Sequence, residues 1–147
     1  MKLIKCFDKV ILTLLGFVGL LSACETVAEY GTPNADFVIK GTITDSISSS
    51  KVPNIRVIRT DVNNPMRKDT IYSDSKGNYQ FTFNSFAYEK PEFDIKVEDI
   101  DGTLNGGEFI AQQARISIIN TDWVNSGDDD WYYGKAIKTR DFKLLKK

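Results

Sequence analysis

Short stretches in which apolar and polar residues alternate recur from residue 36 to the end of the chain. Such alternation predicts strands, because successive side chains of a strand point to opposite faces of a sheet. The predicted strand regions, each bounded by turn-forming residues, are 36–44, 52–60, 70–73, 79–84, 93–98, 108–119, 136–137 and 140–145. No amphipathic helix of useful length is predicted after residue 24. The pattern therefore predicts an all-β fold, an antiparallel β-sandwich of about seven strands.

Glycine and asparagine positions refine this prediction. The clearest hairpin is expected in residues 70–84, where Gly77 and Asn78 tolerate the positive φ that a tight turn requires. Gly41 has the same parity as the apolar residues of its strand, which indicates a bulge or the close approach of another backbone. The acidic segment 120–134 is predicted to be a loop.

The amino-terminal segment has the layout of a secretory signal peptide. Three lysines precede an uncharged run at 10–23, which is too short to span a bilayer comfortably as a helix. Ordinary cleavage after Ala23 is one interpretation, but Leu21 does not fit the small-residue pattern that such cleavage prefers. The sequence Leu-Ser-Ala-Cys at 21–24 instead resembles the lipobox of bacterial lipoproteins. That resemblance implies that Cys24 carries a diacylglyceryl thioether and begins the mature chain.

This interpretation divides the chain into three parts and gives it a location. Residues 1–23 are the cleaved signal peptide helix, 24–35 a lipidated flexible tether, and 36–147 the β-sandwich domain. Each buried CH₂ group contributes about 0.8 kcal/mol, so two or three acyl chains on Cys24 would hold the protein stably at a membrane. We expect a membrane-anchored lipoprotein of the cell envelope, in the outer membrane.

Composition excludes several kinds of chemistry. The chain has no histidine, which removes His-dependent nucleophile systems, His-ligated zinc and His acid–base catalysis. Its two cysteines are Cys6, in the signal peptide, and Cys24, so the folded domain has no thiol for a disulfide or a metal. A net charge of -1 without a basic cluster argues against nucleic acid as a partner. Carboxylates are plentiful, but nothing marks two of them as facing each other across a cleft. We therefore expect that the protein is not an enzyme.

The loop at 99–108 has the composition of a cation site. Ca²⁺ prefers several oxygen ligands from alternate positions of a tight loop, and Asp99, Asp101 and Asn105 could supply them. However, Gly102 is at the fourth position of this loop, whereas an EF-hand has its glycine at the sixth. The alternative is an Asp/Asn/Gly turn between strands, without a cofactor.

Aromatic residues beside carboxylates form the second candidate site. Trp131 and Tyr132 follow three aspartates, and Trp123 lies nearby in the sequence. These rings could bind a glycan, or form a partner surface in which Trp and Tyr dominate the contact energy. The alternative is a solvated loop whose aromatic residues cap one end of the sandwich, and packing is the commoner role of large aromatic side chains.

Residues 36–84 resemble the transthyretin-like, carboxypeptidase-regulatory-like module. The matching pieces are Gly41, Val52-Pro-Asn-Ile-Arg-Val57 and Ser73-Asp-Ser-Lys-Gly-Asn-Tyr-Gln-Phe81. This resemblance implies an Ig-like, transthyretin-like (prealbumin-like) sandwich.

Taken whole, the chain resembles a Bacteroides-type group of radical SAM-associated lipoproteins. The residues that carry this resemblance are Cys24, Glu29-Tyr-Gly-Thr-Pro33, Asp74-Ser-Lys-Gly-Asn78, Asp99-Ile-Asp-Gly102, Asn105-Gly-Gly107 and Trp131-Tyr132. The family name implies a radical SAM enzyme as a possible partner, although this chain lacks the Cys-x₃-Cys-x₂-Cys motif of such an enzyme. We expect a lipid-anchored, non-catalytic envelope protein with a binding or interaction domain. The alternatives are a substrate or accessory protein of a radical SAM enzyme, and a calcium- or glycan-binding surface lipoprotein.

Overall fold

The structure is a computed structural model that describes residues 31–129 and 131–147. Contacts divide the chain into two compact units, Met1–Tyr30 and Gly31–Lys147, and the described residues belong to the second. The predicted signal peptide and Cys24 lie outside the described residues. Within the described part, no helix has the length and apolar character needed to cross a membrane.

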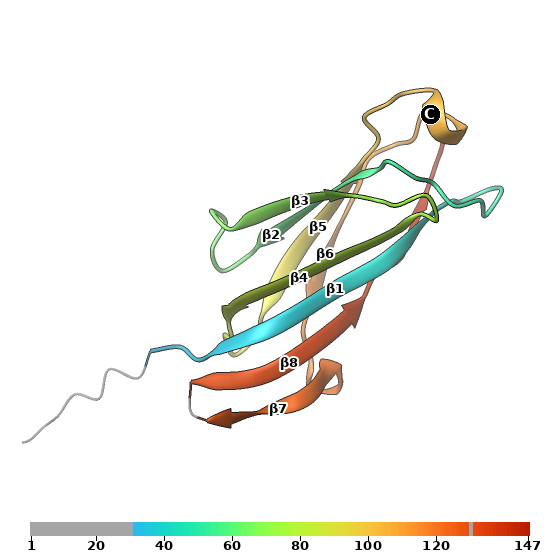
Figure 1. The fold of residues 1–147 in the computed structure, drawn as a ribbon. Helices are drawn as coiled ribbons and strands as arrows, with labels where there is room; N and C mark the ends of the chain where they lie inside the picture. Colours follow the sequence, from blue (N-terminus) through green and yellow to red (C-terminus); the bar gives the residue numbers. More distant parts are fainter. Residues whose placement is uncertain (1–30, 130) are drawn as a thin grey trace, which may run out of the picture. The chain divides into compact units, whose positions relative to one another are not determined.

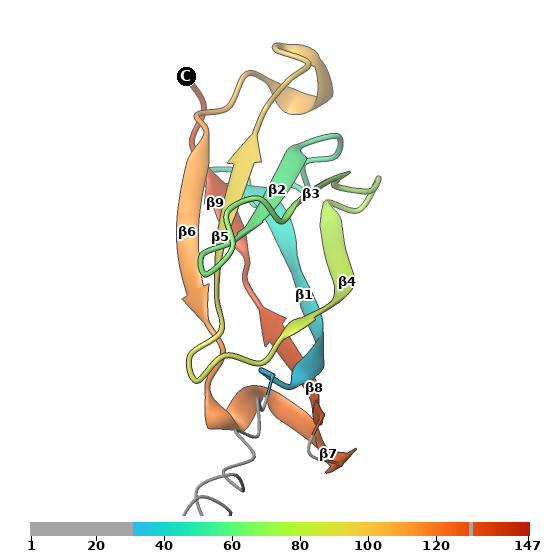
Figure 2. The same cartoon turned by 90° about the vertical axis from the view of Figure 1, so that its left-hand side faces the viewer.

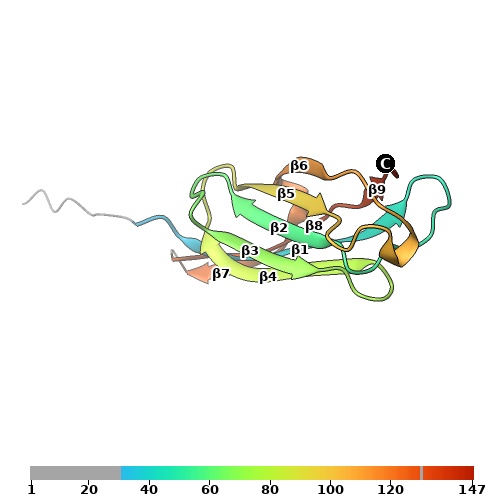
Figure 3. The same cartoon turned by 90° about the horizontal axis from the view of Figure 1, so that it is seen from above.

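The described residues fold into two β-sheets with two short 3₁₀ turns. The strands are β1 (Asn34–Asp45), β2 (Arg56–Asp61), β3 (Lys68–Tyr72), β4 (Asn78–Phe86), β5 (Glu92–Glu98), β6 (Gln112–Ser117), β7 (Trp123–Asp129), β8 (Tyr132–Thr139) and β9 (Phe142–Leu144). One sheet has the order β4-β1-β8-β7, with β9 also paired to β1, and the other has the order β3-β2-β5-β6. Figures 1, 2 and 3 show the sheets from three directions. The predicted all-β sandwich is confirmed, with nine strands in the described residues in place of about seven.

Two pairings differ from the antiparallel prediction. β1 pairs antiparallel with β4, but it pairs in parallel with both β8 and β9. Between β8 and β9 the chain continues alongside β1 and passes Gly41, where a Cβ atom would lie 1.8 Å from the carbonyl oxygen of Arg140. The predicted close backbone approach at Gly41 is therefore confirmed. β1 also begins at Asn34, two residues before the predicted start of the domain, and Ala35 is fully buried.

The predicted hairpin in residues 70–84 is wrong. β3 pairs with β2 in one sheet, whereas β4 pairs with β1 in the other, so the turn between them crosses from sheet to sheet. Asp74 Oδ1 accepts the backbone N–H groups of Lys76 and Asn78, each at 2.8 Å, and Ile43 N–H donates to the carbonyl of Gly77 at 2.8 Å. Gly77 has the expected positive φ of 70°, but Asn78 does not have a positive φ. Local alternation cannot separate the two topologies, because the inward faces of both strands meet the same core.

Two other segments depart from the sequence prediction. The expected loop 120–134 contains a 3₁₀ turn, the whole of β7 and the beginning of β8. Its polar composition is compatible with a strand, because β7 is the outermost strand of its sheet. Of the expected strand 108–119, only β6 is formed, since Ile110 N–H donates to the carbonyl of Leu145 instead of continuing the ladder with β5.

Aromatic rings join the two sheets at the centre of the core. Phe37 of β1 is fully buried, and its ring centroid lies 5.5 Å from that of Phe83, 5.3 Å from that of Phe93 and 5.8 Å from that of Trp123. Offset and edge-to-face pairs at these separations contribute beyond their buried area. Truncation of such a central ring costs about 3–5 kcal/mol.

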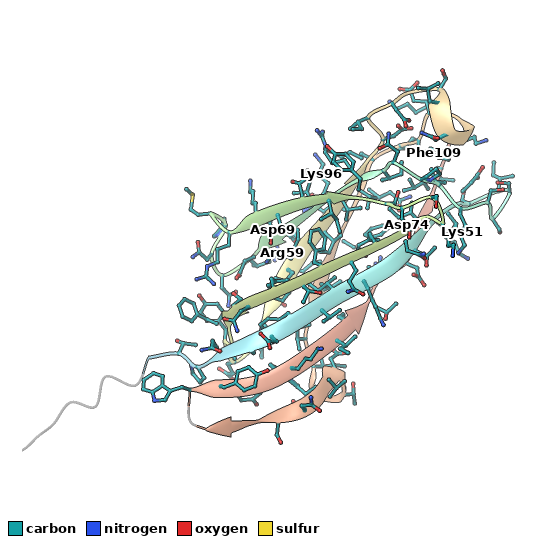
Figure 4. All side chains as sticks on the ribbon, viewed as in Figure 1. Lys51, Arg59, Asp69, Asp74, Lys96 and Phe109 are labelled. Carbon is teal, nitrogen blue, oxygen red and sulfur yellow. The ribbon has the colours of Figure 1, made fainter. Side chains whose placement is uncertain are left out.

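Two charged side chains occupy inward positions of β2. Val57, Arg59 and Asp61 alternate on the buried face, and Arg59 and Asp61 are 4% and 1% exposed. A buried charge is strongly unfavourable unless other groups compensate it. Arg59 forms an ion pair with Asp69 of β3 and lies over the Phe83 ring, 3.7 Å from its centroid. Figure 4 labels Arg59 and Asp69 beside each other, on the side of the sandwich where β3 runs.

Replacement of Gly77 by alanine tests the sheet-crossing turn. Gly77 and Gly102 have φ values of 70° and 68°, so Gly77→Ala and Gly102→Ala carry a similar backbone penalty of about 1–2 kcal/mol. A Cβ at Gly77 would lie 2.6 Å from the carbonyl oxygen of Ile43, whereas nothing lies within 4 Å at Gly102. We expect Gly77→Ala to lose about 1–3 kcal/mol more unfolding free energy than Gly102→Ala, measured by urea denaturation. Equal losses would contradict this packing of the turn on β1.

Candidate functional site

The β7–β8 pair forms an irregular hairpin at one edge of its sheet. Its register shifts twice, and glycines allow the two backbones to approach at these irregularities. A Cβ at Gly134, where φ is 121°, would lie 2.1 Å from the carbonyl oxygen of Asn125. A Cβ at Gly127 would lie 1.4 Å from the carbonyl oxygen of Tyr132. The local conformation of this hairpin therefore depends on glycine at both positions.

Two aromatic rings are held together on this hairpin. The ring centroids of Trp123 and Tyr133 lie 4.6 Å apart in an edge-to-face arrangement. Trp123 is partly buried and also contacts Phe37, so the core holds its indole in place. Tyr133 is 55% exposed, and Val124 beside it is 51% exposed. One ring is thus anchored, and it supports a second ring that faces solvent.

An open groove of about 620 Å³ lies along these rings. We call it the hairpin groove, and its lining residues are Asn120, Trp123, Val124, Asn125, Ser126, Gly127, Tyr132 and Tyr133. None of these lining side chains is charged. The 3₁₀ turn Asn120–Asp122 leads into β7, and Lys138 holds it through an ion pair of 2.8 Å with Asp122. The groove therefore offers aromatic faces together with uncharged amides and hydroxyls.

The predicted aromatic site residues are only partly brought together. Trp123 and Tyr132 line the hairpin groove, and the Tyr132 hydroxyl donates to Asp36 at 3.0 Å. Trp131 is 53% exposed and does not line the groove; its ring lies against Gly31, and its carbonyl accepts the Asn34 N–H at 2.9 Å. The packing interpretation fits Trp123, which belongs to the aromatic core.

Six of the eight groove residues were not singled out from the sequence, among them Tyr133, Asn120 and Asn125. Tyr133 follows the two aromatic residues that were singled out, so the same aromatic run was a signal for it. Asn120 and Asn125 lie in a segment expected to be a loop, and no sequence signal distinguishes them from other turn asparagines.

The loop that contains Asp99, Asp101 and Asn105 is closed by its own hydrogen bonds. Asp99 accepts the backbone N–H of Asp101 at 3.1 Å with one oxygen and that of Phe109 at 2.9 Å with the other. Asp101 Oδ2 accepts a hydrogen bond from the side-chain amide of Asn54 at 2.8 Å, and a second one from the side-chain amide of Asn105. These bonds, with that from Asn54 the largest influence, hold the pKa of the Asp101 carboxyl below its usual value.

This hydrogen bonding matches the turn interpretation of the loop. The carboxylate oxygens of Asp99 are occupied by backbone donors, and Asn105 presents its amide nitrogen to Asp101. Among residues 31–129 and 131–147, no group of three or more Asp, Glu, Cys or His side chains is placed to hold a metal ion. Calcium binding at this loop stays an untested prediction.

Comparison with known proteins supports the fold. No protein-family model and no curated protein sequence matches the chain. A 3-chlorocatechol 1,2-dioxygenase from Rhodococcus opacus 1CP is similar in structure, with a TM-score of 0.50 and 8% identity over 82% of this chain and 62% of that chain. At this identity the similarity shows the β-sandwich fold alone.

Two further solved structures have lower similarity. A candidate carbohydrate-binding protein from Bacteroides uniformis ATCC 8492 has a TM-score of 0.41 and 18% identity, over 76% of this chain and 41% of that chain. The Bacillus anthracis TIE protein has a TM-score of 0.41 and 10% identity, over 78% of this chain and 17% of that chain. Both TM-scores lie below 0.5, so neither similarity carries an argument about this chain. The chain spans less than two thirds of the length of each of these three structures.

The role of the Asp99 carboxylate can be tested with and without calcium. We expect Asp99→Ala to lower the unfolding free energy by about 1–3 kcal/mol, because two backbone N–H groups lose their acceptor. The loss should be the same in millimolar calcium chloride and in EDTA, measured by thermal denaturation with magnesium chloride as the matched control. A calcium-specific rise in the melting temperature of the unaltered chain, absent from Asp99→Ala, would establish the cation site instead.

Proposed function

We propose that the β-sandwich is a non-catalytic binding module and that the hairpin groove binds a neutral glycan. The observation that carries this proposal is the pairing of the exposed Tyr133 ring with the core-anchored Trp123 ring along the groove. A sugar ring has an apolar face of C–H groups and a periphery of hydroxyls. The flat apolar face of an aromatic ring complements the first, and amide and hydroxyl groups complement the second.

The polar lining of the hairpin groove supports an uncharged ligand. Asn120 and Asn125 each offer an amide donor and an acceptor, and Ser126 offers a hydroxyl. Because none of the lining side chains is charged, the groove holds no fixed partner for an ionic ligand. A neutral oligosaccharide can lie along an open groove, whereas a compact ligand is more often enclosed.

The packing of Trp123 favours a preformed site. Its indole contacts both Phe37 and Tyr133, so ligand binding would not have to order this ring. Side chains that are already held in place lose less conformational entropy on binding. The tight backbone contacts at Gly127 and Gly134 restrict the hairpin in the same way.

We further propose that the module works at the cell envelope as a lipoprotein anchored through Cys24. The lipobox resemblance at residues 21–24 supports this proposal. The partnership with a radical SAM enzyme rests on the family resemblance alone and stays a prediction.

Truncation of the exposed ring tests glycan binding. We expect Tyr133→Ala to weaken binding of a neutral oligosaccharide by about tenfold or more, because the ring supplies the solvent-facing part of the platform. The measurement titrates the full-length chain with maltohexaose, xylohexaose and chitohexaose, and follows tryptophan fluorescence and heat of binding. Tyr72→Ala is the matched control, since Tyr72 is also a half-exposed tyrosine, at 51%, on a different sheet. Absence of binding to all three sugars by the unaltered chain, or equal losses in both variants, would overturn the proposal.

The anchor can be tested separately from the ligand. We expect Cys24→Ser to release the protein from membranes, because a serine hydroxyl does not take the thioether-linked lipid. Fractionation of the producing cells measures this release, and mass spectrometry of the native amino-terminus should find the lipid on Cys24. Cys6→Ser is the matched control and should leave the protein membrane-bound. Membrane attachment that survives Cys24→Ser would contradict the assigned location and leave the glycan proposal unaffected.

A further inference from the structure

A second cavity, at the opposite edge of the first sheet from the hairpin groove, has a different chemistry. It is lined by β4, by Arg59 of β2, by the start of β3 with the two residues before it, and by Asn34 of β1, and it has a volume of about 360 Å³. Its charged lining residues are Arg59, Arg67, Lys68 and Asp69, so three cations face one carboxylate. We call this cavity the arginine pocket. β4 and β7 are the two edge strands of their sheet, which separates this cavity from the hairpin groove.

Arg59 is the buried cation of the arginine pocket. Its side chain is 5% exposed, and its Nε and Nη2 atoms both donate to Asp69 Oδ2. The Nη1 atom is buried and has no hydrogen-bond acceptor among the described residues. A guanidinium has five N–H donors, and two of them belong to this nitrogen. Buried polar groups are nearly always paired, so an unpaired cationic donor beside a cavity indicates a missing acceptor.

Asp61 does not supply that acceptor, although it is buried on the same strand. One of its oxygens accepts the backbone N–H groups of Asn63 and Asn64, at 2.9 and 3.2 Å. The other oxygen accepts the Ser85 hydroxyl at 3.1 Å. The Ser85 hydroxyl oxygen in turn accepts a hydrogen bond from Arg67 Nη1 at 3.0 Å. A chain of hydrogen bonds therefore holds Arg67 at the pocket. Asp61 therefore organises the pocket wall through Ser85.

Aromatic rings form the remaining walls. Arg59 lies over Phe83, and the guanidinium carbon of Arg67 lies 4.8 Å from the ring centroid of Phe86. Stacking of this kind holds a guanidinium plane while its edges stay available for hydrogen bonds. The two arginines thus stand against fixed rings and line the same cavity.

We propose that the arginine pocket binds an oxyanion, held between Arg59 and Arg67 with Lys68 at its side. Guanidinium groups match carboxylate and phosphate oxygens in geometry as well as in charge. One nitrogen of the Arg59 guanidinium, Nη1, has no acceptor among the described residues, and the side chain that carries it lines the cavity. Both a ligand carboxylate and a phosphate offer this chemistry, and the experiment separates them. The proposal is independent of glycan binding in the hairpin groove.

The test titrates the full-length chain with sodium phosphate and, separately, with sodium benzoate. Sodium chloride keeps the ionic strength constant, and the neutral amide benzamide is the matched control for benzoate. We expect a saturable rise in the melting temperature, together with saturable amide shifts in β2 and β4. A response to phosphate assigns a phosphate source, and a response to benzoate assigns a carboxylate source. If neither anion gives a saturable response, or benzamide gives the same response as benzoate, the proposal is overturned.

Substitutions locate the site. Arg67→Gln should weaken anion binding by about tenfold, because a charge-assisted hydrogen bond is lost, and Arg59→Lys should weaken it by a similar factor. Arg140→Gln is the matched control, since Arg140 also lies by an aromatic ring, 5.5 Å from the Phe142 centroid, but outside the pocket. If Arg59→Lys does not fold, Arg67→Gln still tests anion binding in the pocket, because Arg67 lies outside the core. Unchanged affinity in folded Arg67→Gln would overturn the proposal.

Discussion

The position of β1 in the middle of its sheet is the constraint on which the rest of the structure depends. β1 pairs with β4 on one side, and with β8 and then β9 on the other. Its inward side chains Phe37, Ile39 and Ile43 are fully buried against the opposite sheet. A strand bonded along both edges and buried on one face has its register strongly specified. Once β1 is in place, its neighbours β4, β8 and β9 are placed as well.

The centre of the core connects this constraint to both cavities. Phe37 contacts Trp123, which supports the hairpin groove, and it also contacts Phe83, which lies under Arg59 in the arginine pocket. A change at Phe37 would therefore affect both cavities through direct packing. Close-packed interiors transmit such changes because a displaced ring has no free volume to enter.

The two cavities lie at different edges of one sheet and differ in charge. The hairpin groove is lined by uncharged side chains, and the arginine pocket is lined by three cations and one carboxylate. The two edges of this sheet therefore present two cavities of different chemistry at separate places.

Much of the fold was predictable, and the failures have a common cause. Alternation in β1, β4 and β5 identified these strands because it reports which face of a strand is buried. The same alternation at residues 70–84 predicted a hairpin where the chain crosses between sheets, because an inward face looks alike in both arrangements. β7 was missed because its polar residues resemble a loop until a neighbouring strand is known.

The candidate sites, like the fold, could be predicted from the sequence only in part. Trp123 and Tyr132 could be selected as aromatic residues in an acidic segment, but their separation from Trp131 depends on the register of β7 and β8. Arg59 and Asp61 carried a signal that was overlooked, since both are charges at inward positions of an alternating strand. Their partners Asp69 and Ser85 could not be assigned, because one lies on the neighbouring strand and the other in the opposite sheet.

By itself the amino-acid sequence determined the all-β class, most strand positions, and the need for glycine at residues 41 and 77. These features depend on near neighbours along the chain, where side-chain parity and backbone freedom act directly. Only the tertiary structure decided which strands pair, where the turn crosses between sheets, and which side chains share a cavity. Those features depend on contacts between distant residues, and many pairings are compatible with the same local pattern until the core is packed.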